Sequence, residues 1–306
     1  MKRVGIICGG SGSSKFATAF SKYADSELDL GFIANVADNY WYHGLYVCPD
    51  VDIITHALAE KLDTSKGWGV ASDTLTGKKV LSELSQSSEW FTLGDSDAAL
   101  CLRRTELMKK GWSLSAITEY LRNSLQIRHP IIPATDDPVM TFIKTAVGLM
   151  HLQQYWVKYK AEPEATAIEY VGLKKAKPNP SAISYLSNYT IICPANPVTS
   201  VMPTISMKLI EKALKKSRVV AISPFVGDKP FSGPAARMIS AIGIEPSSFG
   251  VAKLYSTFLK LFLVDTKEDS KSVTKIKDLG IECIRTNTTI NENSRQSVAM
   301  EIMSSL

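Results

Sequence analysis

The stretch GIICGGSGSSKFATAF, residues 5–20, joins a short apolar run to a glycine- and serine-rich turn and then to a segment with helical spacing. A buried strand, a tight turn and a helix in this order are typical of the first unit of an α/β sheet. Glycines in such a turn let backbone N–H groups approach an anion closely, and the start of the helix adds favourable partial charge. A lysine in the first turns of the helix adds a full positive charge. We therefore predict a phosphate site, with a nucleotide as its ligand. The residues expected to form it are Gly9, Gly10, Ser11, Gly12 and Lys15.

The turn departs from two familiar phosphate-binding patterns. In a Walker loop the lysine follows a glycine and precedes Ser or Thr, whereas Lys15 follows Ser14 and precedes Phe16. In the dinucleotide pattern GxGxxG, Lys15 takes the place of the third glycine. NAD-binding proteins also carry an acid at the tip of the second strand, where this chain has Asn35. An NAD-dependent oxidoreductase is therefore disfavoured.

Apolar runs typical of buried strands recur along the chain, with amphipathic segments between them. Such runs indicate a largely parallel sheet that is covered on both faces. We therefore expect a single α/β domain over residues 1–306, with a doubly wound, mainly parallel, Rossmann-like sheet. Residues 50–126 contain consecutive helical patterns and are expected to form a helical cap, and residues 139–171 a small β-rich insertion. The expected strands are residues 4–8, 28–35, 131–134, 167–171, 189–193, 219–223 and 261–265.

The composition excludes several classes of protein. The 306 residues are 45% hydrophobic and 21% charged, as in an ordinary globular protein. The net charge of +5 is spread along the chain, so we expect no nucleic-acid partner. Five cysteines without a CxxC pair favour reduced thiols, and the four histidines show no zinc spacing. With neither a signal-peptide core nor a run approaching a membrane span, we expect a cytoplasmic protein without membrane contact.

Acidic and amide side chains follow the second expected strand, in NVADNYWYHGLYVCPDVD, residues 35–52. Ligands of α/β proteins bind at the carboxyl edge of the sheet, so these side chains are expected near the phosphate turn. Several carboxylates beside a phosphate suit Mg²⁺, which keeps waters and phosphate oxygens among its ligands. One of the aromatic residues 40–42 could border a planar ligand. One of the two acids Asp50 and Asp52 could instead cap the next helix. The polar side chains concerned are Asn35, Asp38, Asp50 and Asp52.

Two turns in the second half of the chain leave apolar strands through Pro, Asn and Ser, in IICPANPVTSVMP and VVAISPFVG. If their strands neighbour the first strand, Asn196, Ser200 and Ser223 share the edge that carries the glycine turn. Gly233 begins a further expected helix, whose amides could hold a base or a phosphate. Two more acid pairs, in LGDSDAA and PATDDPVM, fit capping or turn chemistry when each acid is taken singly.

A series of motifs over nearly the whole chain resembles the 2-phospho-L-lactate transferase family. In order, these are GGSGSSK, NVADNYWYHGLYVCPDVD, GWGVASDT, WFTLGDSD, RRT, TDDPVMT, PANPVTS, AISPFVG, SGPAARM and FGVA. The resemblance implies an enzyme of coenzyme F420 biosynthesis, typically a homodimer that uses Mg²⁺. It would transfer a phospholactyl or phosphoenolpyruvyl group from a guanosine-diphospho donor to the deazaflavin alcohol FO and release GMP. The resemblance implies that Asp52 and Thr92 correspond to positions at which members of the family contact the deazaflavin. It also implies that the glycine turn and the PANP and ISP turns correspond to the segments with which the family binds guanosine diphosphate.

The chain differs from the family pattern at several positions. The loss of an arginine at residue 96 weakens anion binding, and a methionine in place of a glycine at residue 202 could narrow the nucleotide pocket. These differences bear on donor preference and activity rather than on the fold. The residues that differ are Ser11, Val36, Asn39, Ser96, Cys101 and Met202.

The implied reaction depends mainly on positioning and electrostatics. Attack of a primary alcohol on a diphosphate requires neutralised phosphoryl oxygens and an alcohol held in line. We assign Asp38 and Asp52 jointly to binding the metal and to orienting or deprotonating the alcohol. The alternative is a non-catalytic nucleotide or nucleotide-sugar binding regulator of the YvcK-like type on the same architecture. The helical cap with HGLYVCPDVD and GWGVASDT favours the enzyme, because it suits a bulky acceptor.

Overall fold

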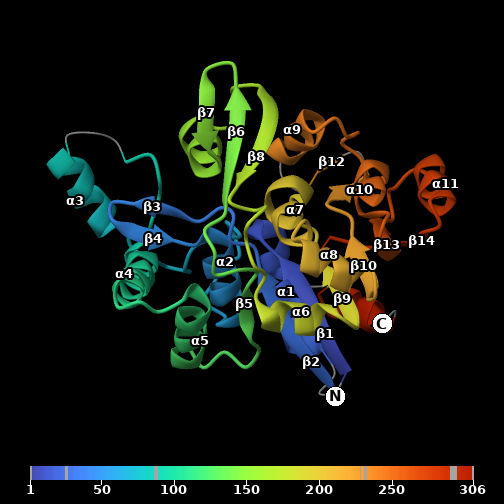
Figure 1. Ribbon diagram of the computed structural model, residues 1–306, viewed down its shortest axis with the longest axis horizontal. Helices are drawn as coiled ribbons and strands as arrows, with labels where there is room; N and C mark the ends of the chain where they lie inside the picture. Colours follow the sequence, from blue (N-terminus) through green and yellow to red (C-terminus); the bar gives the residue numbers. More distant parts are fainter. Residues whose placement is uncertain are drawn as a thin grey trace.

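A seven-stranded parallel sheet, in the order β14-β13-β10-β9-β1-β2-β5, forms the centre of the computed structural model (Figure 1). All neighbouring strands run parallel, which confirms the predicted doubly wound α/β fold. The strands are β1 (Lys2–Cys8), β2 (Leu28–Ala34), β5 (Ile131–Pro133), β9 (Tyr189–Ile192), β10 (Arg218–Ile222), β13 (Leu259–Asp265) and β14 (Glu282–Thr286). The structure describes residues 2–24, 27–85, 89–227, 229–230, 233–289 and 295–304.

The strand order reverses beside β1. From β1 the chain builds outward through β2 and β5, and it then returns to the other side of β1 with β9, β10, β13 and β14. β1 pairs with β2 along its whole length and with β9 from Val4 to Ile7. In open α/β sheets, ligands bind outside the carboxyl ends of the strands where the order reverses. The turns after β1 and β9 therefore mark the expected ligand site.

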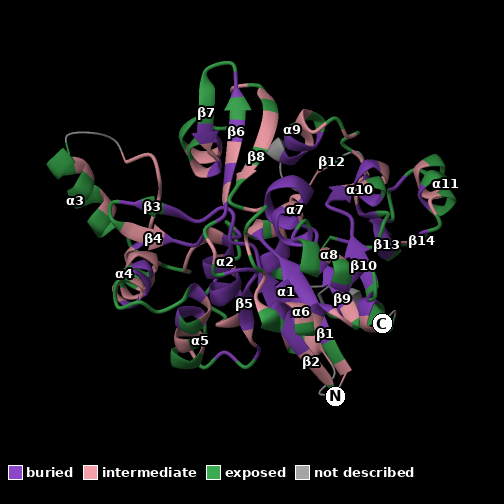
Figure 2. Ribbon diagram, in the orientation of Figure 1, coloured by how far each residue is buried: buried purple, intermediate pink, exposed green. Residues whose placement is uncertain are grey.

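Helices cover both faces of the sheet, because successive side chains of each strand point to opposite sides. Along β1, Ile6 belongs to the same buried cluster as Phe16, whereas Ile7 belongs to the cluster that contains Leu186 and Ile210. Figure 2 shows the central strands as buried. The first helix layer contains α1 (Gly10–Tyr23), α2 (Pro49–Leu58) and α12 (Arg295–Ser304). The second contains α6 (Pro180–Leu186), α7 (Met202–Ile205), α8 (Lys208–Leu214), α9 (Gly233–Ala241), α10 (Ser248–Tyr255) and α11 (Ser270–Asp278).

The segment between β2 and β5 is mostly helical, as its sequence predicts. It opens with an antiparallel hairpin, which the sequence did not reveal, and continues through α2 into three more helices. Among these, α3 projects away from the body (Figure 1) and contains no buried residue. The added elements are β3 (Tyr40–Tyr42), β4 (Leu45–Val47), α3 (Thr76–Ser85), α4 (Asp95–Lys109) and α5 (Leu114–Ser124).

A three-stranded antiparallel sheet, in the order β7-β6-β8, stands at the carboxyl edge of the main sheet (Figure 1). Residues 167–171 lie in this small sheet, so their inclusion among the strands of the parallel sheet was wrong. None of the β8 residues is fully buried, which is typical of an antiparallel strand with one face toward water. β14, which was not expected, completes the main sheet. The small sheet contains β6 (Met140–Thr145), β7 (Gly148–His151) and β8 (Ala165–Val171).

Short elements complete the described chain. Two π-helical turns, η1 (Gln154–Lys158) and η2 (Pro197–Val201), follow β7 and β9, and a small hairpin joins β11 (Phe225–Val226) to β12 (Lys229–Pro230). Gly233 begins α9, as predicted. Within the described ranges, no helix is both long enough and apolar enough to cross a membrane. The cytoplasmic location stays a prediction.

Candidate functional site

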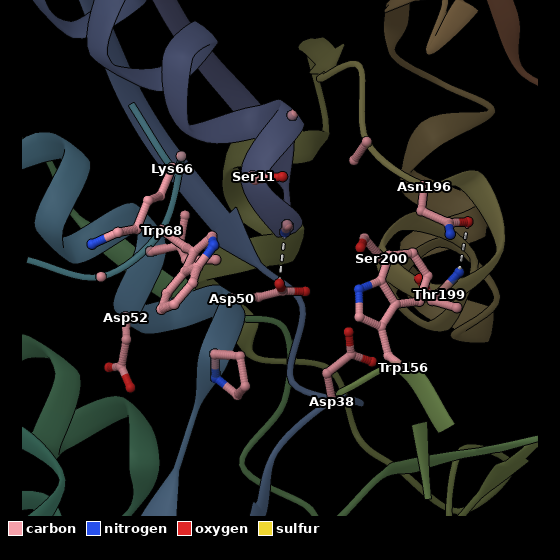
Figure 3. Close-up of a pocket in the computed structure, with 18 of the residues that line it drawn as sticks. Ser11, Asp38, Asp50, Asp52, Lys66, Trp68, Trp156, Asn196, Thr199 and Ser200 are labelled. Atoms are coloured by element: carbon pink, nitrogen blue, oxygen red, sulfur yellow. Dashed lines mark hydrogen bonds between the residues drawn. The ribbon is translucent and has the colours of Figure 1, made fainter. Parts of the chain in front are cut away.

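A cavity of about 710 Å³ opens at the carboxyl edge of the sheet, where the strand order reverses (Figure 3). Its walls come from the turn after β1, the start of α2, residues 66–69, η1 and the turn after β9. The structure thus brings together segments that are far apart in the sequence. Ten of the predicted site residues line the cavity: Gly9, Gly10, Ser11, Gly12, Lys15, Asp38, Asp52, Thr92, Asn196 and Ser200. Asn35 and Ser223 lie behind it.

The glycine turn packs closely against its surroundings. A Cβ atom on Gly12 would lie 2.2 Å from the carbonyl oxygen of Pro194, so α1 approaches the turn after β9 too closely for any larger residue. The Gly10 amide donates a hydrogen bond to Asp50 Oδ1 at 2.6 Å and is therefore already engaged. The amides of Ser11 and Gly12 have no acceptor among the described residues. With the exposed Lys15 on the same cavity wall, these two amides form the candidate anion site.

Asp50 is a site residue that the sequence placed near the ligand but did not single out. It stands in the first turn of α2, yet it does not cap that helix. Its Oδ2 accepts from Asn35 Nδ2 at 2.8 Å, and Asn35 also donates to the Thr199 carbonyl at 3.2 Å. Asn35 therefore positions the wall of the cavity rather than lining it. Burial raises the pKa of Asp50 to about 6, although the hydrogen bonds from Asn35 and Gly10 oppose the shift.

Asp38 lies close enough to Asp50 for the two carboxyl groups to influence each other. Burial and the Asp50 carboxyl raise the pKa of Asp38 well above its usual range. Asp38 Oδ1 is buried and has no hydrogen-bond partner among the described residues. Figure 3 shows both carboxylates on the cavity wall. A buried carboxylate oxygen without a partner is costly, so this wall suits a bound cation or a shared proton.

Asp52 has different surroundings, because it pairs with the buried Arg104 of α4. Arg104 Nη1 lies 3.1 Å from Asp52 Oδ2, and Arg104 Nη2 contacts Asp52 Oδ1. Nη1 also donates to the Tyr46 carbonyl at 3.1 Å. Burial alone would lower the pKa of Arg104, but Asp52 raises it above the ordinary value. The ion pair joins α2 to α4, and it makes Asp52 a poorer candidate than Asp38 or Asp50 for metal ligand or base.

The other predicted binding residues have separate roles. Thr92 lines the cavity, and its hydroxyl accepts a hydrogen bond from Lys78 Nζ at 2.7 Å. Asn196 Oδ1 accepts from the Val198 amide at 3.0 Å and caps η2, while its Nδ2 is buried without a described partner. Ser223 bonds to Ser248 Oγ at 2.8 Å and is fully buried, so it supports the edge from behind.

The aromatic wall differs from the prediction. None of the residues Tyr40–Tyr42 lines the cavity. Tyr40 and Tyr42 pack into a small cluster with neighbouring aromatic rings, and Trp41 is exposed. The aromatic lining comes instead from Trp68, Phe91 and Trp156.

A histidine and an aspartate also line the cavity without having been predicted. His56 and Asp97 form a hydrogen-bonded pair between α2 and α4. The sequence gave no signal for this pair, because a contact across 41 positions depends on how the two helices pack. By contrast, Asp95, Asp136 and Asp137 accept hydrogen bonds from loop or helix-start amides, in keeping with capping and turn chemistry.

Comparison with known proteins agrees with this architecture. A family model described as 2-phospho-L-lactate transferase CofD matches residues 4–303. The chain belongs to this family. The 2-phospho-L-lactate transferase of Methanosarcina mazei is 32% identical over 97% of this chain and 98% of the relative. The phosphoenolpyruvate transferase of Streptomyces coelicolor is 34% identical over 92% of this chain and 90% of the relative.

Membership of the 2-phospho-L-lactate transferase family makes the chain a transferase, as predicted from its motifs. The fold is also similar to that of a more distant protein of known structure. A UPF0052 family member from Bacillus halodurans has a TM-score of 0.66 and 18% identity, and the match covers 99% of this chain and 100% of that chain. At this identity the likeness concerns the fold alone.

Proposed function

We propose that the chain transfers a phospholactyl or phosphoenolpyruvyl group from a guanosine-diphospho donor to the deazaflavin alcohol FO, with release of GMP, in coenzyme F420 biosynthesis. The family match over residues 4–303 supports a transferase of this kind. The relatives carry the names of both a 2-phospho-L-lactate transferase and a phosphoenolpyruvate transferase. The proposal therefore covers either three-carbon group.

The observation that carries this function is the convergence of an anion site and two buried carboxyl groups, Asp38 and Asp50, in a single cavity with aromatic walls. The amides of Ser11 and Gly12 and the Lys15 ammonium suit the diphosphate of a nucleotide. The buried Asn196 Nδ2 offers a further donor on the side of β9. A cavity of about 710 Å³ is large enough for a drug-sized ligand together with part of a second one.

In the proposed step, the FO hydroxyl attacks the phosphorus atom that carries the three-carbon group. A new oxygen–phosphorus bond forms as the bond to the bridging oxygen of GMP breaks, and the hydroxyl proton passes to a nearby carboxylate or to water. The chain contributes by holding the diphosphate, orienting the hydroxyl and neutralising charge. Asp52 is the poorer carboxylate for the proton, because it is occupied by Arg104.

We propose Mg²⁺ as the cofactor, held by Asp38 and Asp50 rather than by the predicted pair of Asp38 and Asp52. The buried Asp38 Oδ1, which has no described partner, and the neighbouring Asp50 carboxyl suit a cation between them. Within the described ranges, no group of three or more His, Cys, Asp or Glu residues could hold a metal ion. Diphosphate oxygens and waters would complete the octahedral shell that Mg²⁺ prefers. When bound, the ion supplies positive charge to the phosphoryl oxygens.

The test of this function is a reaction with defined substrates. The chain is incubated with FO, Mg²⁺ and either the lactyl or the enolpyruvyl guanosine-diphospho donor, and GMP and the FO product are separated by chromatography. We expect GMP and product in equal amounts. Asp38→Asn serves as the control and should release at least ~10²-fold less GMP. Nucleotide binding without GMP release would support the regulator of the YvcK-like type instead.

A further inference from the structure

The mechanism above does not use the hydrogen-bonded pair of His56 and Asp97 on the cavity wall. His56 lies in the last turn of α2 and Asp97 in the first turn of α4. His56 Nε2 and Asp97 Oδ1 are 2.6 Å apart. Because a carboxylate accepts hydrogen bonds, His56 carries its proton on Nε2. Its Nδ1 is buried and has no described partner. The histidine therefore fixes the orientation of the Asp97 carboxylate.

The second oxygen of Asp97 is available to a ligand. Oδ2 makes no hydrogen bond to any residue that the structure describes, whereas Oδ1 is held by His56. The Asp97 side chain is 15% exposed and lines the cavity, while the His56 side chain is 5% exposed. A carboxylate with one oxygen fixed and the other accessible suits a hydrogen-bond donor such as a hydroxyl or a ring N–H.

The loop of residues 66–69 connects this carboxylate to the phosphate turn. A Cβ atom on Gly67 would lie 3.3 Å from Ser11 Cβ, so this end of the loop rests on the glycine turn. A Cβ atom on Gly69 would lie 3.6 Å from Asp97 Oδ2, so the other end rests on the carboxylate. Trp68 stands between the two glycines. Trp68 is 42% exposed and lines the cavity (Figure 3).

These contacts place a flat aromatic surface between an anion site and a hydrogen-bond acceptor. We propose that Trp68 and Asp97 form the acceptor subsite of the cavity, with His56 as a positioning residue. Trp68 stacks on the planar ring of the acceptor, and Asp97 Oδ2 accepts a hydrogen bond from its hydroxyl or ring N–H. The subsite rests on the proposed function, because it takes a tricyclic alcohol of the FO class as its ligand. It adds a contact set on the α4 side of the cavity to the predicted contacts of Asp52 and Thr92.

Equilibrium dialysis of the full chain against FO tests this subsite. We expect Trp68→Ala and Asp97→Asn to raise the Kd for FO by roughly tenfold each, the effect of losing one stacking or charged hydrogen-bond contact. His56→Gln should raise the KM for FO with little change in kcat, because the carboxylate remains but is no longer fixed. The Kd for GDP should stay within about twofold of the original value in all three variants, which separates acceptor binding from donor binding.

Matched controls are present on the same chain. Trp112 is 44% exposed, like Trp68, and His43 Nε2 lies 2.7 Å from Glu89 Oε2, in a pair like that of His56 and Asp97. Neither Trp112 nor His43 lines the cavity. Trp112→Ala and His43→Gln should therefore bind FO like the unmodified chain.

The outcomes separate the subsite from the function. Unchanged FO binding in both Trp68→Ala and Asp97→Asn overturns the subsite while leaving the function intact. Failure of the unmodified chain to bind FO overturns both. If Asp97→Asn lowers the unfolding temperature strongly, the test depends on the variants Trp68→Phe and Trp68→Ala. We then expect Trp68→Phe to keep part of the FO binding and Trp68→Ala to lose it. A purely structural role for His56 would lower the unfolding temperature and leave the KM for FO unchanged.

Discussion

Asp38 and Asp52 carry the same functional group but lie in opposite surroundings. Asp52 meets the buried guanidinium of Arg104, whereas Asp38 has a buried oxygen without a described partner. A buried charge is tolerated when it is paired and costly when it is not. The two residues therefore differ in what they contribute to stability and to catalysis, although the sequence predicts the same role for both.

Removal of the Asp52 charge should destabilise the fold. Asp52→Asn leaves Arg104 buried without its anion, so we expect the free energy of unfolding to fall by about 3–5 kcal/mol. Urea unfolding followed by circular dichroism measures this loss. Asp38→Asn is the matched control and should keep the original stability, while the double variant Asp52→Asn/Arg104→Met should recover much of the loss. Equal stability of Asp52→Asn and Asp38→Asn would contradict the assigned ion pair.

The close contact at Gly12 predicts a binding defect. In Gly12→Ala the new methyl group meets the Pro194 carbonyl oxygen, which lies 2.2 Å from the ideal Cβ position. Because the methyl group is fixed to the backbone of α1 and the oxygen belongs to the backbone of Pro194, the start of α1 must shift, and its free amides move with it. We expect at least a ~10-fold weaker Kd for GDP, which corresponds to the loss of about one good hydrogen bond. Isothermal titration calorimetry measures this Kd, and unchanged affinity would show that the amides do not bind the diphosphate.

The residues of the turn and Asp38 could be predicted, because glycines, a lysine and an acid after apolar strands are local patterns. Asp50, His56 and Asp97 were missed or misread, since their partners lie 15 to 41 positions away. Such contacts depend on how α1, α2 and α4 pack. Composition and spacing contain no measure of that packing.

Among the helices, α3 stands out because none of its residues, all of which the structure describes, is buried. Val80, Leu81 and Leu84 are exposed, and Leu84 is 77% exposed. An apolar helix surface in water is typical of a protein interface. We propose that a second copy of the chain covers α3, in the homodimer that the resemblance to the family implies.

A charge on α3 should therefore weaken the dimer. We expect Leu81→Glu and Leu84→Glu to shift the chain from dimer toward monomer in sedimentation velocity, because a carboxylate is costly to bury at an interface. Leu209→Glu, at a leucine of α8 that is also exposed, is the control and should leave the dimer intact. A monomeric unmodified chain, or a Leu84→Glu variant that remains fully dimeric, would contradict this assignment.

Element types were predicted better than element partners. Six of the seven expected strands lie in the parallel sheet, because long apolar runs between helical segments are strong local signals. Residues 165–171 form a strand as well, but in the small antiparallel sheet. The sequence does not specify which strands pair, so the place of residues 165–171 in the small sheet could not be predicted. The hairpin β3–β4 was overlooked because its strands have only three residues each.

At the scale of the whole molecule, the reversal of strand order beside β1 explains why the cavity lies at the carboxyl ends of β1 and β9. The turns after β1 and β9 leave neighbouring strands in the same direction, so their amides and side chains converge without a dedicated domain. The segment between β2 and β5 then adds α2, residues 66–69 and α4 on one side, and the β6–β8 insertion adds η1 on the other. The cavity is therefore a product of topology as much as of any one motif.

Magnesium should stabilise the whole molecule in a pH-dependent way. The folded pKa values of Asp38 and Asp50 are raised, so the stability contributed by their protonated forms is complete below the ordinary carboxyl pKa. The part that Asp50 contributes is lost as the pH rises through about 6, and the part that Asp38 contributes is lost as the pH rises through its own raised pKa. Mg²⁺ can replace the lost protons only when the carboxyls are ionised. We expect millimolar MgCl₂ to raise the unfolding temperature by a few degrees at about pH 8 and by little at about pH 4.5. Differential scanning calorimetry measures both.

Asp50→Asn is the control for this effect and should remove most of the stabilisation by Mg²⁺ at the higher pH. A stabilisation of equal size at both pH values, or one that persists in Asp50→Asn, would place the ion elsewhere.

The central claim is that the cavity beside β1 and β9 holds a nucleoside diphosphate on the free amides of α1, next to two carboxylates that bind a cation. Diffraction from crystals grown with GDP and Mg²⁺ tests it most directly. The predicted difference density places the diphosphate against the amides of Ser11 and Gly12 and near Lys15, with the metal ion between it and the carboxylates of Asp38 and Asp50. Density for GDP at another surface, or an empty cavity at saturating GDP, would contradict the claim.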